Sequence, residues 1–212
     1  MPKDCWIEEF ASILRVGTEN ERTAIFEKLV EIGNDVALFL LISALPQEKS
    51  AYVRRKIVSL LGTKKDSLVV TLVIPLLSAR EAPVRGMAQE ILVSLGSLAI
   101  EGLTDLMLDD SRDVRKQAVD VLAKIPGDCS FELLIEGLED SDLIVVIGCI
   151  EALGQRGDKR SVAPLAAILK TFPSTWVGFS IIQALNALGD EGNIAVMNEY
   201  MASVKIPGER TG

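Results

Sequence analysis

Apolar residues recur along this sequence at intervals of three and four residues, which is the spacing of one face of an α-helix. The stretch 84–95 shows the pattern in full, with apolar side chains at Val84, Met87, Ala88, Ile91, Leu92 and Leu95. The alternation with period two that marks half-buried β-strands is absent throughout. The hydrophobic pattern therefore predicts an all-α protein.

The helical pattern is itself repeated, because a Val-Arg pair returns at nearly constant spacing. The repeat positions, counted as position zero in each copy, are Glu21, Val53, Val84, Val114, Val145 and Val177. Successive positions lie 30 to 32 residues apart. A unit of this size forms one helical hairpin, which cannot bury its apolar stripe alone, so neighbouring copies must stack. We therefore predict an α–α superhelix, a solenoid of about six hairpins closed by a C-terminal capping helix.

Glycines and short polar links set the expected helix ends. Each copy carries a helix stop, at Gly33, Gly62, Gly96, Gly127, Gly157 and Gly189. The first helices of the hairpins are expected near 19–32, 50–62, 82–95, 111–125, 142–156 and 174–188. Before them a helix is expected near 4–15, between them helices near 34–45, 66–78, 98–108, 129–138 and 159–170, and after them a cap near 190–203. No linker composition divides the chain, so we predict a single domain over 1–205 and a frayed tail over 206–212.

The pattern D-x-x-V-R-x-x-A, followed by A-L-G and then P-L, resembles HEAT repeats. The fifth copy carries Glu151-Ala152-Leu153-Gly154 and then Val162-Ala163-Pro164-Leu165. The short period resembles the HEAT-like repeats of phycobilin lyases and of prokaryotic HEAT-repeat proteins. In that family the Val-Arg helix lines the concave side, and its Arg pairs with an Asp of a neighbouring turn. The resemblance thus implies a structural ladder of Arg22, Arg54, Arg85 and Arg115 with acids such as Asp113, Asp142, Asp109, Asp110 and Asp140.

Two features of the last copies indicate an interaction surface. Position +1, where Arg is expected, holds Val146 in the fifth copy, and position +2 holds Ile147 and then Phe179. Together with Trp176 these residues predict an exposed apolar patch that anchors a partner helix or loop. The alternative is that the final helix, which contains Met197, folds over these residues and buries them as a cap.

Position +6 forms a row rich in carboxylates, which includes Glu90, Asp120 and Glu151. Such a row selects a basic or amphipathic partner by charge complementarity. An ordinary solvated helix face gives the same pattern, because Glu is a favourable surface residue on helices. Both interpretations stay open at this point.

Composition removes several classes of function. The chain holds 30 acidic and 22 basic residues, for a net charge of −8, which disfavours nucleic acid as a partner. It holds no histidine, which removes the commonest general base and metal ligand, and no nucleotide-binding loop appears. We predict no cofactor and no metal. Scattered cysteines and the lack of an apolar run near 20 residues favour a cytoplasmic protein without a membrane span.

The sequence as a whole predicts a non-enzymatic adaptor that holds another protein or peptide in its groove. Self-association through the apolar patch stays an alternative. The family resemblance offers one further alternative, a phycobilin-lyase-like enzyme or tetrapyrrole chaperone. Deoxyhypusine hydroxylase shares this style of repeat, but that family uses His and Glu to bind iron, and this chain has no His.

Overall fold

The structure is a computed structural model that describes residues 5–171 and 175–189. Over those residues it contains helices and turns and no β-strand. Internal contacts divide the chain into two compact units, an N-terminal unit, Met1–Leu106, and a C-terminal unit, Met107–Gly212. The all-α fold is therefore confirmed. The single domain over 1–205 stays a prediction, and the predicted cap at 190–203 and tail at 206–212 lie outside the described residues.

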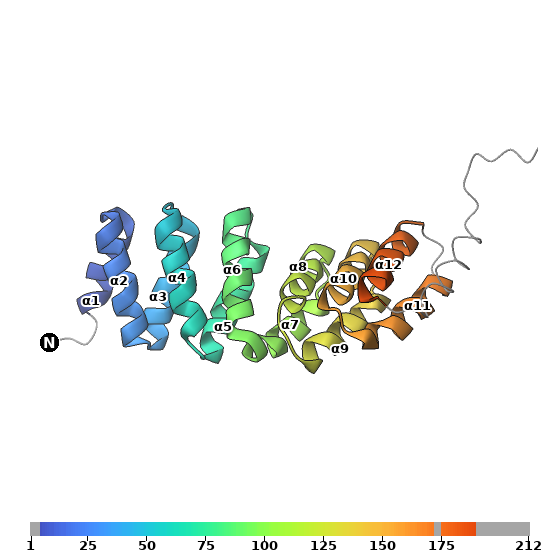
Figure 1. Cartoon of the computed structure of the whole chain (residues 1–212). Helices are drawn as coiled ribbons and strands as arrows, with labels where there is room; N and C mark the ends of the chain where they lie inside the picture. The colour runs from blue at the N-terminus through green and yellow to red at the C-terminus, as the bar shows by residue number, and fades with distance from the viewer. Residues whose placement is uncertain (1–4, 172–174, 190–212) are drawn as a thin grey trace, which may run out of the picture. The chain divides into compact units, whose positions relative to one another are not determined.

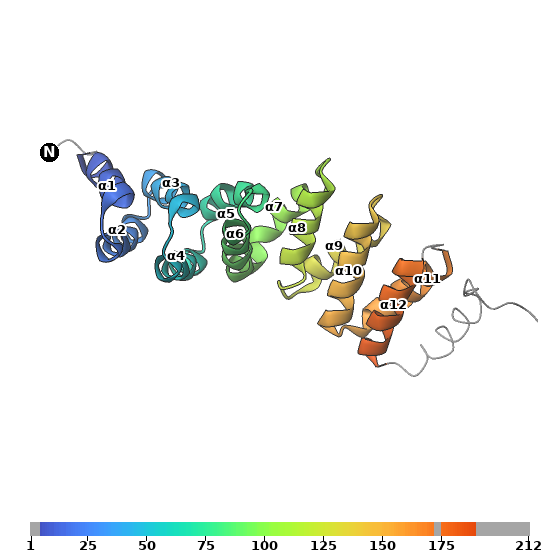
Figure 2. The ribbon, with the colours of Figure 1, turned by 90° about the horizontal axis from the view of Figure 1, so that it is seen from above.

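The N-terminal unit consists of two layers of helices, which Figures 1 and 2 show from two directions. The inner layer contains the helices with the Val-Arg positions: α2 (Glu19–Ile32), α4 (Ala51–Thr63) and α6 (Ala82–Leu95). The outer layer contains α1 (Cys5–Val16), α3 (Asp35–Ala44) and α5 (Ser67–Val73). The next outer helix, α7 (Ile100–Met107), follows α6 after a short 3-10 turn. Helices α1 and α2, α2 and α3, and α5 and α6 pack against each other, and within each layer α2 packs on α4, α4 on α6 and α3 on α5, as a solenoid requires.

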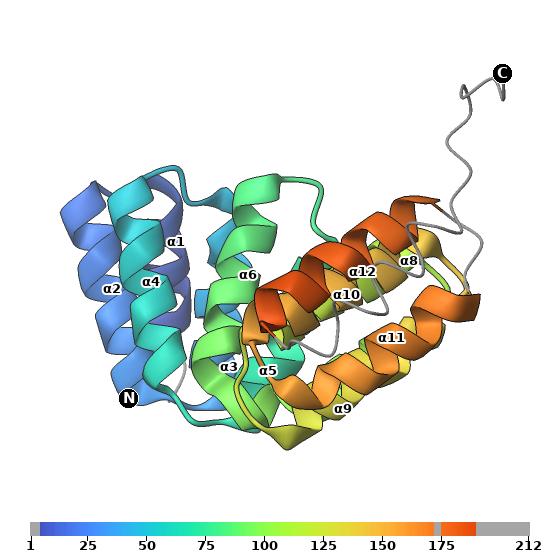
Figure 3. The same ribbon diagram turned by 45° about the vertical axis from the view of Figure 1, so that its right-hand side comes forward.

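The C-terminal unit repeats this arrangement, and Figure 3 shows its two layers most clearly. Its inner layer contains α8 (Arg112–Leu122), α10 (Leu143–Arg156) and α12 (Thr175–Leu188). Its outer layer contains α9 (Asp128–Glu136) and α11 (Val162–Thr171). The pair α10 and α12 is the most closely packed in this unit, and Gly154 lies at the contact.

Most helix ends lie where the sequence places them, because capping groups fix them locally. Thr18 caps α2 with a reciprocal pair of hydrogen bonds to Glu21, and Gly33 ends the helix in the left-handed region with φ 59°. Of the six predicted stops, all but Gly62 have positive φ. Gly62 lies inside α4, where its lack of a side chain lets the helix approach Ser94 of α6. The predicted helix 111–125 is shorter in the structure and ends at Leu122.

Several outer segments change from α-helix to 3-10 helix part of the way along. Pro46 and Pro75 stand at the beginning of the 3-10 turns Leu45–Gln47 and Ile74–Ser78. Proline has no N–H to donate to the preceding turn of an α-helix, so the longer helix ends there. The remaining 3-10 turns are Gly96–Ala99, Gly137–Glu139 and Lys159–Ser161.

The apolar stripes of the repeats form the core between the two layers. The stripe of residues 84–95 is buried at all its apolar positions, and Ala88, Ile91 and Leu92 have no exposed surface. The equivalent positions Val53 and Val145 are fully buried as well. The helical periodicity therefore identified the core of both units. None of the described helices is long and apolar enough to cross a membrane.

Candidate functional site

An arginine of α8 links one repeat to the next in the C-terminal unit. The Nε and Nη2 atoms of Arg115 donate to the two carboxylate oxygens of Asp140 at 2.6 and 2.8 Å. Its Nη1 donates to the backbone carbonyls of Asp109 and Asp110. The hydrogen bonds from Arg115 hold the pKa of the Asp140 carboxyl below its ordinary value. Both side chains are nearly buried, so this pair is an internal clamp between hairpins.

The N-terminal unit contains the same device with a glutamate in place of the aspartate. Arg22 donates from Nε and Nη2 to the carboxylate of Glu48 at 2.7 and 2.9 Å, and from Nη1 to the carbonyl of Gly17. Burial of Glu48 opposes ionisation, but hydrogen bonds from Arg22 and the backbone of Ser50 outweigh it, and the pKa of Glu48 is lowered. The carbonyl of Glu48 also accepts from Arg54. Glu48 therefore joins the first two hairpins.

Of the acids that the sequence offered for this ladder, Asp140 is the carboxylate partner of Arg115, whereas Asp113 and Asp142 are not. Asp113 is almost fully exposed and approaches only Arg112, at 3.8 Å. Asp142 accepts from the backbone N–H of Ile144 and from Arg112, so it caps α10. The link before α10 turns Asp140 toward Arg115, and helix spacing alone does not contain that information.

Arg54 and Arg85 occupy the same repeat position without such a carboxylate partner among the described contacts. Arg85 donates to the carbonyls of Ala79 and Arg80, which belong to the preceding link. Arg54 donates to the carbonyl of Glu48, so both arginines bind backbone carbonyls of the link that precedes their own helix. All four arginines have structural roles here.

The prediction that Val146 belongs to an exposed patch needs correction, because Val146 has no exposed surface. Position +1 is the position from which Arg115 reaches between two hairpins, so it faces the neighbouring repeat. In the fifth copy an apolar residue fills that space, and in the sixth the buried Gly178 takes it. Val146 is therefore a core residue.

The remaining apolar residues of the predicted patch lie on two adjacent helices, α10 and α12 (Figure 3). Trp176 is 79% exposed and Phe179 is 58% exposed, both on α12. Ile147 of α10 is half-buried, and Ile144, one turn before it, is 48% exposed. We call these four residues the α10–α12 patch. The sequence reading missed Ile144, although its place three residues before position +2 puts it on the same helix face.

Polar residues border the α10–α12 patch. On α8 the ammonium of Lys116 contacts the carboxylate of Asp120 at 2.6 Å. The stem of Lys116 packs on Gly148, where an added Cβ would lie 2.7 Å from Lys116 Cε. On α10 the exposed Glu151 follows Ile147 by one turn. The α10–α12 patch is therefore an apolar surface with charged residues at its edge.

The predicted acidic row is divided between the two units. Asp120 and Glu151 belong to α8 and α10 of the C-terminal unit, whereas Glu90 is exposed on α6 of the N-terminal unit. Asp120 is paired with Lys116, and Glu27, which holds position +6 in the first copy, contacts Lys56 at 2.9 Å. Glu151 is thus the exposed carboxylate closest in sequence to the apolar anchors of α10.

Chemistry of other kinds has little support among the described side chains. No group of three or more His, Cys, Asp or Glu residues in the described part is arranged to hold a metal ion. Cys149 is buried, and burial raises the pKa of its thiol to about 12, which keeps it protonated at neutral pH. Cys129 is exposed. Neither is placed as an activated nucleophile.

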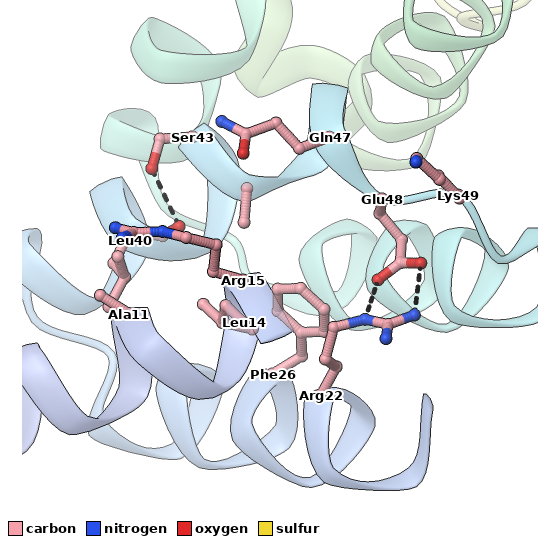
Figure 4. Close-up of a pocket in the computed structure, with 11 residues that line it drawn as sticks. Ala11, Leu14, Arg15, Arg22, Phe26, Leu40, Ser43, Gln47, Glu48 and Lys49 are labelled. Carbon is pink, nitrogen blue, oxygen red and sulfur yellow. Dashed lines mark hydrogen bonds and ion pairs between the residues drawn. The ribbon is translucent and has the colours of Figure 1, made fainter. Parts of the chain in front are cut away.

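A cleft of about 340 Å³ lies beside α1 in the N-terminal unit, and Figure 4 shows the residues around it. Leu14, Phe26 and Leu40 contribute its apolar surface. Dashed lines in Figure 4 join Arg22 to Glu48, and another joins the hydroxyl of Ser43 to the carbonyl of Leu40. The first inter-repeat clamp therefore forms part of the wall of this cleft.

Comparisons with known proteins agree on the type of repeat. The sequence profile described as HEAT repeats matches residues 37–123 and 131–205. No curated protein matches the sequence. Human deoxyhypusine hydroxylase in complex with glycerol is 18% identical, with a TM-score of 0.45, over 94% of this chain and 90% of its own. A designed armadillo repeat protein in complex with the peptide (KR)4 is 17% identical, with a TM-score of 0.43, over 85% of this chain and 98% of its own. Likeness at this level says nothing about activity or ligands.

Proposed function

This chain belongs to the HEAT-repeat family, and on that basis we propose that it is a non-enzymatic adaptor that binds another protein through the α10–α12 patch. The observation that carries the proposal is the pair of exposed aromatic side chains, Trp176 and Phe179, on one face of α12. Large apolar side chains are usually buried in soluble proteins, and clusters of them at the surface are typical of interaction sites. Tryptophan is also the residue most enriched among the energetic centres of protein interfaces.

The geometry of the patch favours a helix or an extended loop as the bound segment. Ile144 and Ile147 lie one turn apart on α10, as Trp176 and Phe179 do on α12. The four side chains thus form two parallel pairs on a rigid surface, because α10 and α12 are firmly packed. A preformed surface loses little conformational entropy on binding, so most of the gain from burying these side chains is retained.

The rim of the patch sets an expected charge preference. Glu151 is exposed beside the anchors, and Asp120 keeps part of its negative charge despite its contact with Lys116. A bound segment with apolar anchors and a flanking Lys or Arg would complement both features. We therefore expect affinity to fall as salt is added, since exposed charges are screened over about 8–10 Å at ordinary ionic strength.

The decisive experiment is affinity capture from native cytosol with the wild-type protein, Phe179→Asp and Tyr52→Asp. Tyr52 is a matched control, because it is 56% exposed but lies on α4 of the N-terminal unit. We expect a stoichiometric protein that Phe179→Asp loses and Tyr52→Asp retains. Circular dichroism of each variant checks that the helices remain folded.

A captured protein that both variants retain would contradict the assignment of the site. A coloured small molecule bound to the wild-type protein in place of a protein partner would contradict the adaptor proposal itself. Trp176 provides an internal reporter, because the chain has two tryptophans and Trp6→Phe leaves Trp176 as the only one. The exposed Trp176 should then show a blue shift in its emission when the captured partner is added.

A further inference from the structure

The outer layer of the N-terminal unit carries a second exposed apolar surface. Val36 is 47% exposed and Phe39 is 61% exposed, both on α3. With Leu68 and Leu72 of α5 they line a cleft of about 300 Å³, and Asp35 stands at its edge. The helices α3 and α5 are neighbours in the outer layer (Figure 2). This cleft is outside the α10–α12 patch and plays no part in the adaptor site proposed above.

A second cleft, of about 380 Å³, follows on the other side of α5, against α7. Val70, Ile74 and Leu98 contribute its apolar surface, and the polar edge is formed by Glu101 and Asp105 of α7. At Gly102 of α7 an added Cβ would meet the end of the Ile74 side chain, in the 3-10 turn that follows α5, so the missing side chain leaves room for that turn. The fold thus places two apolar clefts side by side, one on each flank of α5.

The charges of this surface all have the same sign. The helical segments 35–47, 67–78 and 96–107 form the outer layer after α1, and they contain no Lys or Arg. Their charged residues are Asp35, Glu101 and Asp105, all of which are exposed. The inner helix α4 of the same unit, by contrast, carries Arg54, Arg55 and Lys56 in succession. A surface that is apolar and carries only negative charge is complementary to a segment with apolar anchors and basic flanks.

We propose that these two clefts form a second docking surface, which binds a basic amphipathic helix of another protein. Neighbouring helices of a layer are about 8–10 Å apart, and a helix advances about 1.5 Å per residue, so the two clefts match apolar anchors about seven residues apart. The first anchor enters between α3 and α5, beside Phe39, and the second enters between α5 and α7, beside Leu98. Lys or Arg residues of the bound helix lie against Glu101 and Asp105.

The test uses a synthetic fluorescent peptide of about four helical turns, with Leu at heptad spacing and Lys on both flanks of the apolar stripe. A matched peptide carries Glu in place of Lys. Binding to the intact protein is measured by fluorescence anisotropy. We expect the Lys peptide to bind and the Glu peptide to bind at least about tenfold more weakly, because like charges then face each other.

Variants of the protein locate the binding site. Phe39→Ser should weaken binding of the Lys peptide by about tenfold or more, as loss of an aromatic anchor does. The double variant Glu101→Gln and Asp105→Gln should weaken binding less and should reduce its dependence on salt. Tyr52→Ser should leave binding unchanged, since Tyr52 is 56% exposed on the inner helix α4 and belongs to neither proposed site. Phe39 is exposed, so its replacement is not expected to impair folding.

Three outcomes would overturn the proposal. The first is equal affinity of the Lys peptide for the wild-type protein and Phe39→Ser. The second is loss of binding in Phe179→Ser alone, which would assign the peptide to the α10–α12 patch instead. The third comes from sedimentation without peptide, if the wild-type protein is a dimer and Phe39→Ser is a monomer. The surface would then be an interface between two copies of this chain.

Discussion

The exposed inner faces of the two units differ sharply, although both are built from the same hairpin. In the N-terminal unit position +2 holds Thr23, Arg55 and Gly86, and the face is polar. In the C-terminal unit the same position holds Lys116 and then the apolar pair Ile147 and Phe179. The buried position zero, by contrast, holds Val in both units, at Val53, Val84, Val145 and Val177. A solenoid therefore keeps its core constant and changes its binding properties through the few positions that face outward.

The clamps between repeats, unlike the exposed positions, are similar in the two units. Each unit contains a clamp, and the two clamps have nearly the same geometry. Arg22 and Glu48 in the first unit correspond to Arg115 and Asp140 in the second. The arginine side chain is more exposed in the first clamp, at 20% against 11%, whereas the carboxylate side chain is less exposed there, at 2% against 8%. The comparison of the clamps therefore tests whether burial of the arginine or of the carboxylate sets the contribution of an ion pair to stability.

The largest effect is expected from breaking a clamp. Arg115→Ala should lower the free energy of unfolding by about 3 kcal/mol, because Asp140 is left charged and largely buried without its partner. Arg22→Ala should cost a similar amount, because it leaves Glu48, whose side chain is 2% exposed, charged and without its partner. Urea unfolding measures the loss, and hydrogen exchange should place it in the unit that carries the variant. Arg55→Ala, at an exposed position, is the control and should stay within about 0.5 kcal/mol of wild type. Equal losses for Arg115→Ala and Arg55→Ala would show that the clamp adds nothing to stability.

A somewhat smaller effect is expected from crowding the contact between α10 and α12. An added Cβ at Gly154 would lie 2.8 Å from Ala184 Cβ and 2.9 Å from its Cα, so the helices must separate. We expect Gly154→Ala to destabilise the C-terminal unit by about 1–3 kcal/mol, as overpacking does. In the N-terminal unit Gly86 has nothing near its Cβ position, and Gly86→Ala should stabilise by about 0.5–1 kcal/mol. Thermal unfolding should show a lower Tm for Gly154→Ala and a higher Tm for Gly86→Ala. Shifts of the two Tm values in the same direction would contradict this account.

Acid should weaken the two clamps over different ranges of pH. The folded state lowers the pKa of Glu48 from its ordinary 4.5 and that of Asp140 from its ordinary 3.8. Because folding lowers these pKa values, the stability that each ionised carboxylate contributes is complete above its ordinary pKa. That stability is lost as the pH falls through the pKa of the folded state. The Glu48 contribution should therefore begin to decline at a higher pH than that of Asp140. Hydrogen exchange in each unit between neutral pH and pH of about 3 measures this order. A decline that is unchanged in Arg22→Ala would assign the acid sensitivity to other groups.

The smallest effect is expected at a buried hydroxyl of the C-terminal unit. Ser161 is fully buried, and its Oγ has no hydrogen-bond partner among the described groups, whereas the buried Glu48 of the first unit has several. Removing an unsatisfied polar atom costs nothing in hydrogen bonding, so Ser161→Ala should be neutral or stabilising by up to about 1 kcal/mol. Urea unfolding checks this, with Ser130→Ala as the contrast. Ser130 is also buried but donates to the carbonyl of Ile125, so its loss should destabilise.

The sequence by itself determined the helical hairpins, their spacing and their buried stripes. These features depend on local interactions, because the period of a helix fixes which residues share a face and a glycine such as Gly157 ends a helix within one turn. The sequence also identified Ile147 and Phe179 as surface candidates from repeat position +2, and Trp176 as an apolar residue beside them.

Tertiary structure decided which groups meet across repeats. Arg115 pairs with Asp140 rather than Asp113, and Val146 is buried, because the path of each link and the packing of the next hairpin set those contacts. The cleft beside Phe39 has the same origin, since it exists only where α3 and α5 are stacked. Local periodicity assigns a side chain to one face of its own helix. Whether that face meets solvent, an ion-pair partner or a neighbouring helix depends on residues about 30 positions away, whose placement local patterns do not encode.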